Sequence, residues 1–291
     1  MLRKGDLTQG GITGTLLHFT LPMMVGSFLQ QCYNIADTLI VGQCIGAGAL
    51  AAVGSAYTLM VFLISVLLGL AMGSGTVFSL HYGAGNHVAL RRSIFSSFVL
   101  IGIVTLILNV AVFIWLDPIL RLLQVPQDIY GMMRSYLWII FCGIVFTFIY
   151  NFYASLLRAV GDSVTPLWFL AVSVVLNIAL DLFFILQLDW GIQGAAAATV
   201  LAQGVAALGI IIYTYRRRPE LRWHHEDMCF DRTCLKEIAS FSTLTCIQQS
   251  VMNLGILMVQ GLVNSFGTAV MAAFAAAVKI DSFAYMPVQE F

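Results

Sequence analysis

The chain has 291 residues, of which 60% are hydrophobic and 10% are charged. A soluble domain has about 45–50% apolar and about 25% charged residues, so this composition indicates a membrane protein with several spans. Basic and acidic residues are equal in number, 14 each, which excludes a strongly basic surface of the kind that binds nucleic acids.

Long apolar runs predict a bundle of transmembrane helices, because a helix needs about 20 mainly apolar residues to cross the hydrocarbon core. In chain order, the predicted helices cover residues 13–41, 50–80, 94–115, 132–157, 166–186, 192–215 and 238–263, and a further apolar run starts at Thr268. The longest polar loop covers residues 216–236. The predicted fold class is therefore all-α, a polytopic membrane helix bundle.

The distribution of lysine and arginine predicts which side of the membrane each loop faces. With a cytoplasmic N-terminus, the inner loops carry most of these residues, among them Arg91, Arg158 and Arg216, whereas the outer loops carry Arg121 and Arg134. Cytoplasmic loops are enriched in lysine and arginine. We therefore expect a multi-pass protein of the inner membrane, surrounded by membrane lipids, with a cytoplasmic N-terminus.

One acidic residue, Asp37, lies within the first predicted helix. A carboxylate near the centre of a membrane helix costs at least about 2.5–3.5 kcal/mol on insertion scales, so it is a candidate functional group by default. Asn34 and Thr38 add polar atoms beside it, and no lysine or arginine lies within ten residues. We expect Asp37 to face the protein interior and to bind a proton or a cation. The alternative is an acid near a helix end that reaches the lipid headgroups.

A second polar cluster combines the fifth and sixth predicted helices. Asn177 and Asp181 are four residues apart and share one face of a helix. Thr199, on the next helix, lies about as far after the intervening turn as Asp181 lies before it, so the two have similar depth. Together with Asp37 they form a candidate oxygen-only site for a small cation, or a carboxylate pair that shares a proton. The alternative is two unrelated acids, each satisfied within its own helix.

Other features are less specific. Pro22 predicts a kink or hinge in the first helix. Aromatic, methionine and amide side chains could line a cavity for organic cations. The candidate lining residues are Met24, Phe28, Tyr33, Asn34, Tyr57, Tyr150, Asn151, Tyr153 and Gln203. The sequence has no HExxH, GxSxG or Walker-type motif, so we predict neither an enzyme nor a bound cofactor or metal, beyond the ion at the carboxylates.

Several motifs resemble those of one transporter family. They are Leu21-Pro22, residues 34–37, residues 157–162 followed by Thr165-Pro166, residues 177–181 and residues 191–196. In these motifs the chain is similar to multidrug and toxic compound extrusion (MATE) transporters, closest to the bacterial DinF-like branch. The resemblance implies two lobes of six helices that export small organic cations in exchange for H⁺ or Na⁺. It also implies a cation site at Asp37, Asn177, Asp181 and Thr199.

The resemblance divides the chain into three parts. Residues 1–215 correspond to the N-terminal six-helix lobe, residues 216–236 to a cytoplasmic loop between lobes, and residues 237–291 to the incomplete start of a second lobe. Because the family's members are longer, we expect a chain truncated after its seventh or eighth helix, completed by the missing lobe or by a second chain. Two alternatives stay open: a flippase for lipids or lipid-linked oligosaccharides, which would need a cationic cavity, and a truncated membrane subunit without transport activity.

Overall fold

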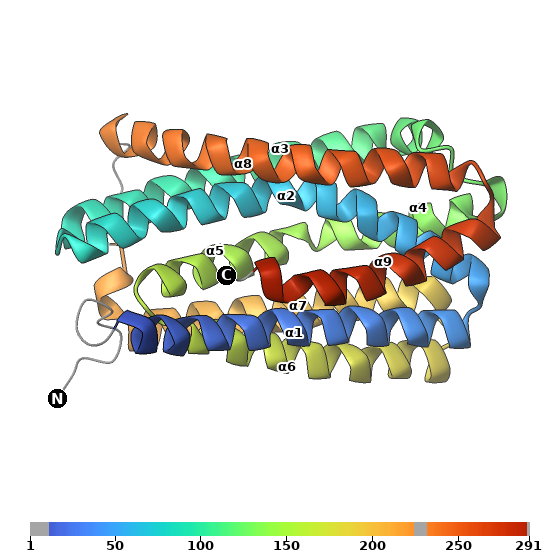
Figure 1. Cartoon of the computed structure of the whole chain (residues 1–291), viewed down its shortest axis with the longest axis horizontal. Coiled ribbons are helices and arrows are strands. Elements are labelled where there is room, and N and C mark those ends of the chain that lie inside the picture. The colour runs from blue at the N-terminus through green and yellow to red at the C-terminus, as the bar shows by residue number, and fades with distance from the viewer. Residues whose placement is uncertain (1–11, 224–231, 290–291) are drawn as a thin grey trace.

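The structure, a computed structural model, describes residues 12–223 and 232–289. Over these residues the chain forms long helices that lie roughly side by side along the long axis of the molecule (Figure 1). The helices are α1 (Ile12–Cys44), α2 (Ala47–Gly83), α3 (His87–Leu122), α4 (Gln127–Cys142), α5 (Ile144–Ala159), α6 (Val164–Leu182), α7 (Gly191–Arg217), α8 (Arg232–Asn264) and α9 (Thr268–Gln289). A π-helical turn (Phe183–Gln187) follows α6, and a 3₁₀ turn (Pro219–Leu221) follows α7. The predicted all-α fold class is confirmed.

Membrane-spanning length and hydropathy are found in most of these helices. Among the described residues, five segments qualify as candidate spans: α2, α3, residues 164–187, α7 and residues 235–264. α4 and α5 qualify together as a sixth span with a bend of 50°. α1 is not among them, although its 33 residues are more than long enough. Its C-terminal half carries the polar residues Gln30, Gln31, Asn34 and Asp37.

The prediction of one continuous helix over residues 132–157 is wrong, because the chain breaks between α4 and α5 at Gly143. Glycine weakens a helix by about 1 kcal/mol relative to alanine. α7 also packs closely here, since a Cβ at Gly143 would lie 2.5 Å from Cγ2 of Val200. The side-chain amide of Asn109 donates to the Phe141 carbonyl oxygen at 2.6 Å. That bond satisfies a backbone group next to the break, as the interior of a membrane protein requires.

Two predicted helix boundaries are also wrong. α3 continues through Asp117, Pro118 and Arg121, which were assigned to a loop. α8 begins at Arg232, inside the predicted loop 216–236, of which residues 224–231 lie outside the described part of the chain. The reason is common to both cases. Hydropathy marks only the part of a helix inside the hydrocarbon core, about 30 Å thick, whereas a helix of 36 residues such as α3 is about 54 Å long.

Small residues bring α2 into backbone contact with α8 and α9. A Cβ at Gly69 would lie 2.5 Å from Cα of Cys246, and a Cβ at Gly73 would clash with the backbone of Ser242. Small residues at such contacts allow membrane helices to approach closely, which increases their van der Waals contact. We call this contact the α2–α8 glycine seam.

A polar cluster joins the same two helices near the N-terminal end of α2. The Gln260 amide donates to Ser55 Oγ and to Asn264 Oδ1, both at 2.8 Å, and Ser55 Oγ donates to Asn264 Oδ1 at 3.0 Å. Thr58 Oγ1 donates to Gln260 Oε1 at 3.2 Å, and Asn264 Nδ2 donates to the Leu123 carbonyl oxygen at 2.8 Å. All four side chains are buried. Hydrogen bonds inside a bundle are the usual way to satisfy such groups.

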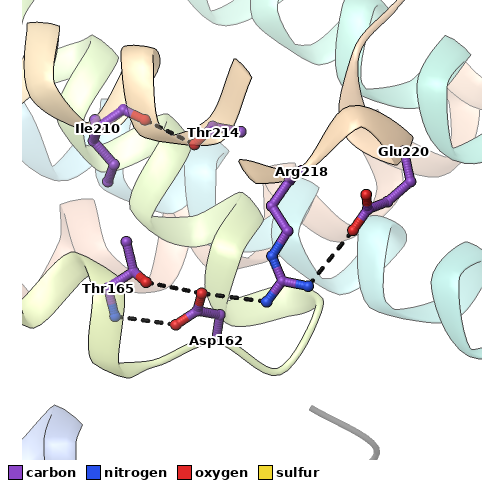
Figure 2. A network of polar contacts seen from close by, with 6 residues as sticks. All are labelled: Asp162, Thr165, Ile210, Thr214, Arg218 and Glu220. Atoms are coloured by element: carbon purple, nitrogen blue, oxygen red, sulfur yellow. Dashed lines mark hydrogen bonds and ion pairs between the residues drawn. The ribbon is translucent and has the colours of Figure 1, made fainter. Parts of the chain in front are cut away.

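The turn between α5 and α6 is fixed by one carboxylate (Figure 2). Gly161 adopts a positive φ of 85°, and Asp162 Oδ1 then accepts the Thr165 backbone N–H at 3.0 Å, which caps the N-terminus of α6. Asp162 Oδ2 also accepts from Thr165 Oγ1 at 2.8 Å and from Arg218 at 3.3 Å. Arg218 pairs in addition with Glu220 at 3.5 Å. This network therefore joins the start of α6 to the end of α7.

We expect Gly73→Ala to lower the stability of the protein, because the added methyl group forces α2 and α8 apart. Overpacking of this kind typically costs about 1–3 kcal/mol. The matched control is Gly83→Ala in the same helix, where nothing lies within 4 Å of the added Cβ. Thermal unfolding in detergent, followed by tryptophan fluorescence, measures both variants. Equal unfolding midpoints for the two variants would contradict the close contact at the glycine seam.

The two roles of Asp162 can be separated by substitution. Asp162→Asn keeps an acceptor for the Thr165 N–H but removes the charge that faces Arg218, whereas Asp162→Ala removes both. We expect Asp162→Ala to be the less stable variant by about 1 kcal/mol, the usual contribution of an N-cap. The same unfolding measurement compares them. If Asp162→Asn is as unstable as Asp162→Ala, the carboxylate acts through its charge alone.

Candidate functional site

The two acids of the predicted site face each other across α1 and α6. Asp37, on α1, is 8% exposed, and Asp181, on α6, is fully buried. Their carboxyl groups lie close enough for a side-chain hydrogen bond between them. A carboxylate is only an acceptor, so this bond exists only when one of the two groups carries a proton. The pair therefore holds at most one negative charge in the hydrogen-bonded state.

A neutral hydrogen-bond chain leads to Asp181 from the other side. With its amide nitrogen turned toward Asp181, Asn177 donates to Oδ2 at 2.8 Å and its oxygen accepts from Thr199 Oγ1 at 3.3 Å. Tyr33 Oη lies 3.2 Å from the same threonine oxygen. Because the Thr199 hydroxyl has one proton, which Asn177 accepts, Tyr33 must be the donor to Thr199. All the dipoles of the chain thus point their positive ends toward Asp181.

These contacts depend on three adjacent helices. α6 packs against both α1 and α7, and α1 also contacts α7 (Figure 1). Asn177 and Asp181 are one helical turn apart on α6, so both side chains face the same neighbours. Asp37, Asn177, Asp181 and Thr199, the four residues predicted to form the site, are therefore gathered at one place. Their role as ligands of a proton or a cation stays a prediction.

A cavity of about 100 Å³ lies next to these residues. Its wall includes Asn177 and Thr199, as well as four of the predicted lining residues, Tyr33, Tyr150, Asn151 and Gln203. Thr147 donates a hydrogen bond to Gln203 across the cavity wall. The remaining lining residues were not predicted. They are Gln30, Thr147, Leu170, Ser173, Val174, Ala202 and Ala206.

Helical periodicity could have identified some of the missed residues. Gln30 lies three positions before Tyr33 and Ser173 lies four positions before Asn177, so each shares a helix face with a residue of the site. Leu170, Val174, Ala202 and Ala206 have no such chemical signal. Apolar residues on a helix face toward a cavity and toward the core look the same in a sequence.

Five predicted lining residues do not line this cavity: Met24, Phe28, Asn34, Tyr57 and Tyr153. Phe28 is 44% exposed, because it lies two positions from Gln30 and therefore on nearly the opposite side of α1. Tyr153 is buried and packs edge-on against Phe152 and Phe98 in the core. An aromatic residue in a membrane helix can pack against lipid, against the protein core or against a cavity. Residue type alone therefore does not indicate which aromatic residues line the cavity.

Pro22 lies inside α1, which continues as one helix from Ile12 to Cys44. It lines a second cavity that we describe below. Its role as a hinge stays a prediction. Among the described residues, no group of three or more histidine, cysteine or acidic side chains could hold a metal ion. A cation at the site would therefore need neutral oxygen ligands in addition to the two carboxylates.

Comparison with known proteins identifies similar sequences. The family model MatE matches residues 22–183. The probable multidrug resistance protein YpnP of Bacillus subtilis (strain 168) is 32% identical over 98% of this chain and 64% of its own length. The probable multidrug resistance protein NorM of Thermotoga maritima is 27% identical over 94% of this chain and 59% of its own length. The chain thus spans less than two thirds of the length of these relatives.

Solved structures have the same arrangement of helices. One, described as the outward-facing conformation of a multidrug resistance MATE family transporter of the MOP superfamily, has a TM-score of 0.89 and 23% identity. The match covers 100% of the present chain and 64% of the chain in that solved structure. Another, described as the inward-facing conformation of such a transporter, has a TM-score of 0.82 and 25% identity, over 94% of this chain and 62% of its own.

The bond between Asn177 and Asp181 can be measured by a double-mutant cycle. Asn177→Leu removes the donor to a buried carboxyl group, and we expect a loss of about 1–3 kcal/mol in unfolding free energy. In an Asp181→Asn background, the same substitution should cost less, because the carboxylate that needed the donor is gone. Unfolding of the four proteins in detergent measures the coupling. Strictly additive losses would mean that the two side chains do not interact.

Proposed function

Because the chain belongs to the MatE family, that of the MATE transporters, we propose that it takes part in the export of small organic cations across the inner membrane in exchange for H⁺ or Na⁺. The names of its relatives, which are multidrug resistance proteins, support drug-like substrates. Residues 1–215 form the first lobe in this proposal, residues 216–236 the cytoplasmic connection and residues 237–291 the start of the second lobe. The rest of that lobe, or a second chain, completes the transporter.

One observation carries the proposed coupling: the carboxyl groups of Asp37 and Asp181 meet inside the bundle, next to a polar cavity. Two negative charges at this distance in a medium of low dielectric repel strongly, so binding of a proton or of Na⁺ is favoured. Loss of that ion restores the repulsion and pushes α1 away from α6. The ion on the carboxylates and the position of α1 are then coupled, which is the requirement for exchange.

The size of the cavity supports a movement of α1 during transport. Pockets for drug-sized ligands are typically about 300–1,000 Å³, whereas this cavity is about 100 Å³. An organic cation can therefore enter only if a wall moves. α1 supplies Gln30 and Tyr33 to that wall and carries Asp37, so its displacement would change both the ion site and the cavity. Pro22 is the proposed pivot, because its ring removes a backbone hydrogen bond from the helix.

We expect Asp37→Asn and Asp181→Asn each to abolish ion-driven efflux while the protein still reaches the membrane, because neither variant can form the doubly charged pair whose repulsion moves α1. The measurement is uptake of a fluorescent organic cation, such as ethidium, by inside-out vesicles with an imposed pH or Na⁺ gradient. Which of the two gradients drives uptake also identifies the coupling ion.

The matched control is Asp189→Asn, the same chemical change at an exposed acid outside the site. Asp189 has a φ of 52°, a conformation that asparagine adopts readily, so this variant should fold and transport normally. Wild-type efflux in the Asp37→Asn variant would exclude the proposed coupling. Loss of efflux in all three variants would indicate a general folding effect.

A further inference from the structure

A second cavity, of about 180 Å³, continues from the one beside the carboxyl pair. The two cavities share four wall residues: Gln30, Tyr150, Asn151 and Leu170. Beyond these, the second cavity is lined by residues nearer the N-terminal ends of α1 and α6 and the C-terminal end of α5. Those that matter here are Pro22, Ser27, Arg158 and Ser163.

The cavity walls formed by α1, α5 and α6 extend toward the same end of the lobe. The walls run from Tyr33 to Pro22 on α1, from Thr147 to Arg158 on α5, and from Asn177 to Ser163 just before α6. At 1.5 Å per residue, each stretch is about 16–21 Å long. The combined space therefore covers more than half of a hydrocarbon core about 30 Å thick.

Polar groups line this space at intervals of about one helical turn. Tyr33 and Thr199 lie at its inner end, Thr147 and Gln203 are bonded to each other in the middle, and Tyr150 Oη donates to the Pro166 carbonyl oxygen at 3.0 Å further along. A buried water needs about 10–15 Å³ of free space and 2–4 polar partners. Both cavities meet these conditions, so a file of water molecules fits between Arg158 and the wall residues Asn177 and Thr199, which adjoin the carboxyl pair.

We propose that the two cavities form one hydrated half-channel inside the lobe, which conducts protons between the Asp37–Asp181 pair and the side of the membrane at which Arg158 lies, and that the Arg158 guanidinium opposes the entry of metal cations. The proposal rests on the proposed function of the carboxyl pair. In the release step, the proton shared by the two carboxyl groups passes to a water that enters between the pair and the cavity wall at Asn177 and Thr199, and both groups are left charged. Each water then gives one proton and receives one, so an excess proton emerges near Arg158.

This route differs from exchange through the space between two lobes. Its walls come from α1, α5, α6 and α7, all within residues 12–217. The ion site can therefore exchange protons with the side at which Arg158 lies without passing through a space between lobes. Arg158 makes such a path selective for protons. Its fixed positive charge at the end of the path repels Na⁺ by Coulomb forces, while a proton moves by exchange between waters.

Cysteine labelling tests whether the path holds water. In a background without the native cysteines, Ser27→Cys lies in the second cavity, whereas Val25→Cys lies two residues away at an exposed apolar position that lines neither cavity. The cysteine thiolate, which forms only where water is present, attacks a methanethiosulfonate reagent, so that a disulfide forms and methanesulfinate leaves. We expect the anionic sulfonatoethyl reagent to label Ser27→Cys several-fold faster than Val25→Cys. The reaction should occur from the side on which the exposed Arg216→Cys reacts.

The charge of the reagent tests the role of Arg158. A cationic trimethylammonium-ethyl reagent should label Ser27→Cys more slowly than the anionic one, and Arg158→Gln should remove that difference. The proposal is overturned if Ser27→Cys and Val25→Cys react equally, if Ser27→Cys reacts only from the opposite side, or if Arg158→Gln leaves the ratio of the two rates unchanged. These rates do not require transport, so they separate a failure of this path from a failure of the proposed efflux activity.

Discussion

The rest of the structure depends on one constraint, the contact of two carboxyl groups inside a bundle that lipid surrounds. Neither group can be charged there without strong interactions, and both cannot be charged at once without strong repulsion. The groups described around Asp181 stabilise the negative charge through neutral dipoles rather than through basic side chains. Tyr33, Thr199 and Asn177 point their positive ends toward Asp181. The negative charge is thus stabilised but not cancelled, and the pair keeps its affinity for a small positive ion.

The same constraint explains the composition of α1. This helix supplies Gln30 and Tyr33 to the cavity and Asp37 to the carboxyl pair, so several polar groups interrupt its apolar run. An isolated helix of this kind would insert poorly into lipid. Contacts with α6, α2 and α9 cover much of its surface in the folded protein. Stability and function therefore oppose each other in α1, as is usual where polar groups lie within a membrane.

The sequence predicted the all-α architecture and the proximity of Asp37, Asn177, Asp181 and Thr199, whereas it predicted local details less well. Asn177 and Asp181 were linked by helical spacing, and Thr199 by its distance from a short turn, both of which are local properties. The break at Gly143 could not be predicted, because it depends on contact with Val200, more than fifty residues away. The cavity wall was only partly predicted for the same reason. Met24 and Phe28 have the right chemistry, but which side of α1 faces the cavity is decided by the packing of neighbouring helices.

The α2–α8 contact has a mechanical consequence. At the glycine seam no bulky side chain separates the two backbones, and Ser242 Oγ donates to the Leu70 carbonyl oxygen at 3.2 Å. At the other end of the contact, Ser55, Gln260 and Asn264 tie the helices together with several buried hydrogen bonds. Any movement of α8 that keeps those bonds is therefore a rotation about this end of the helix. Such a rotation must break the hydrogen bond between Ser242 and Leu70 and the contact of His81 Nε2 with Glu237 at 3.3 Å, and the opening is greatest where the latter two side chains meet.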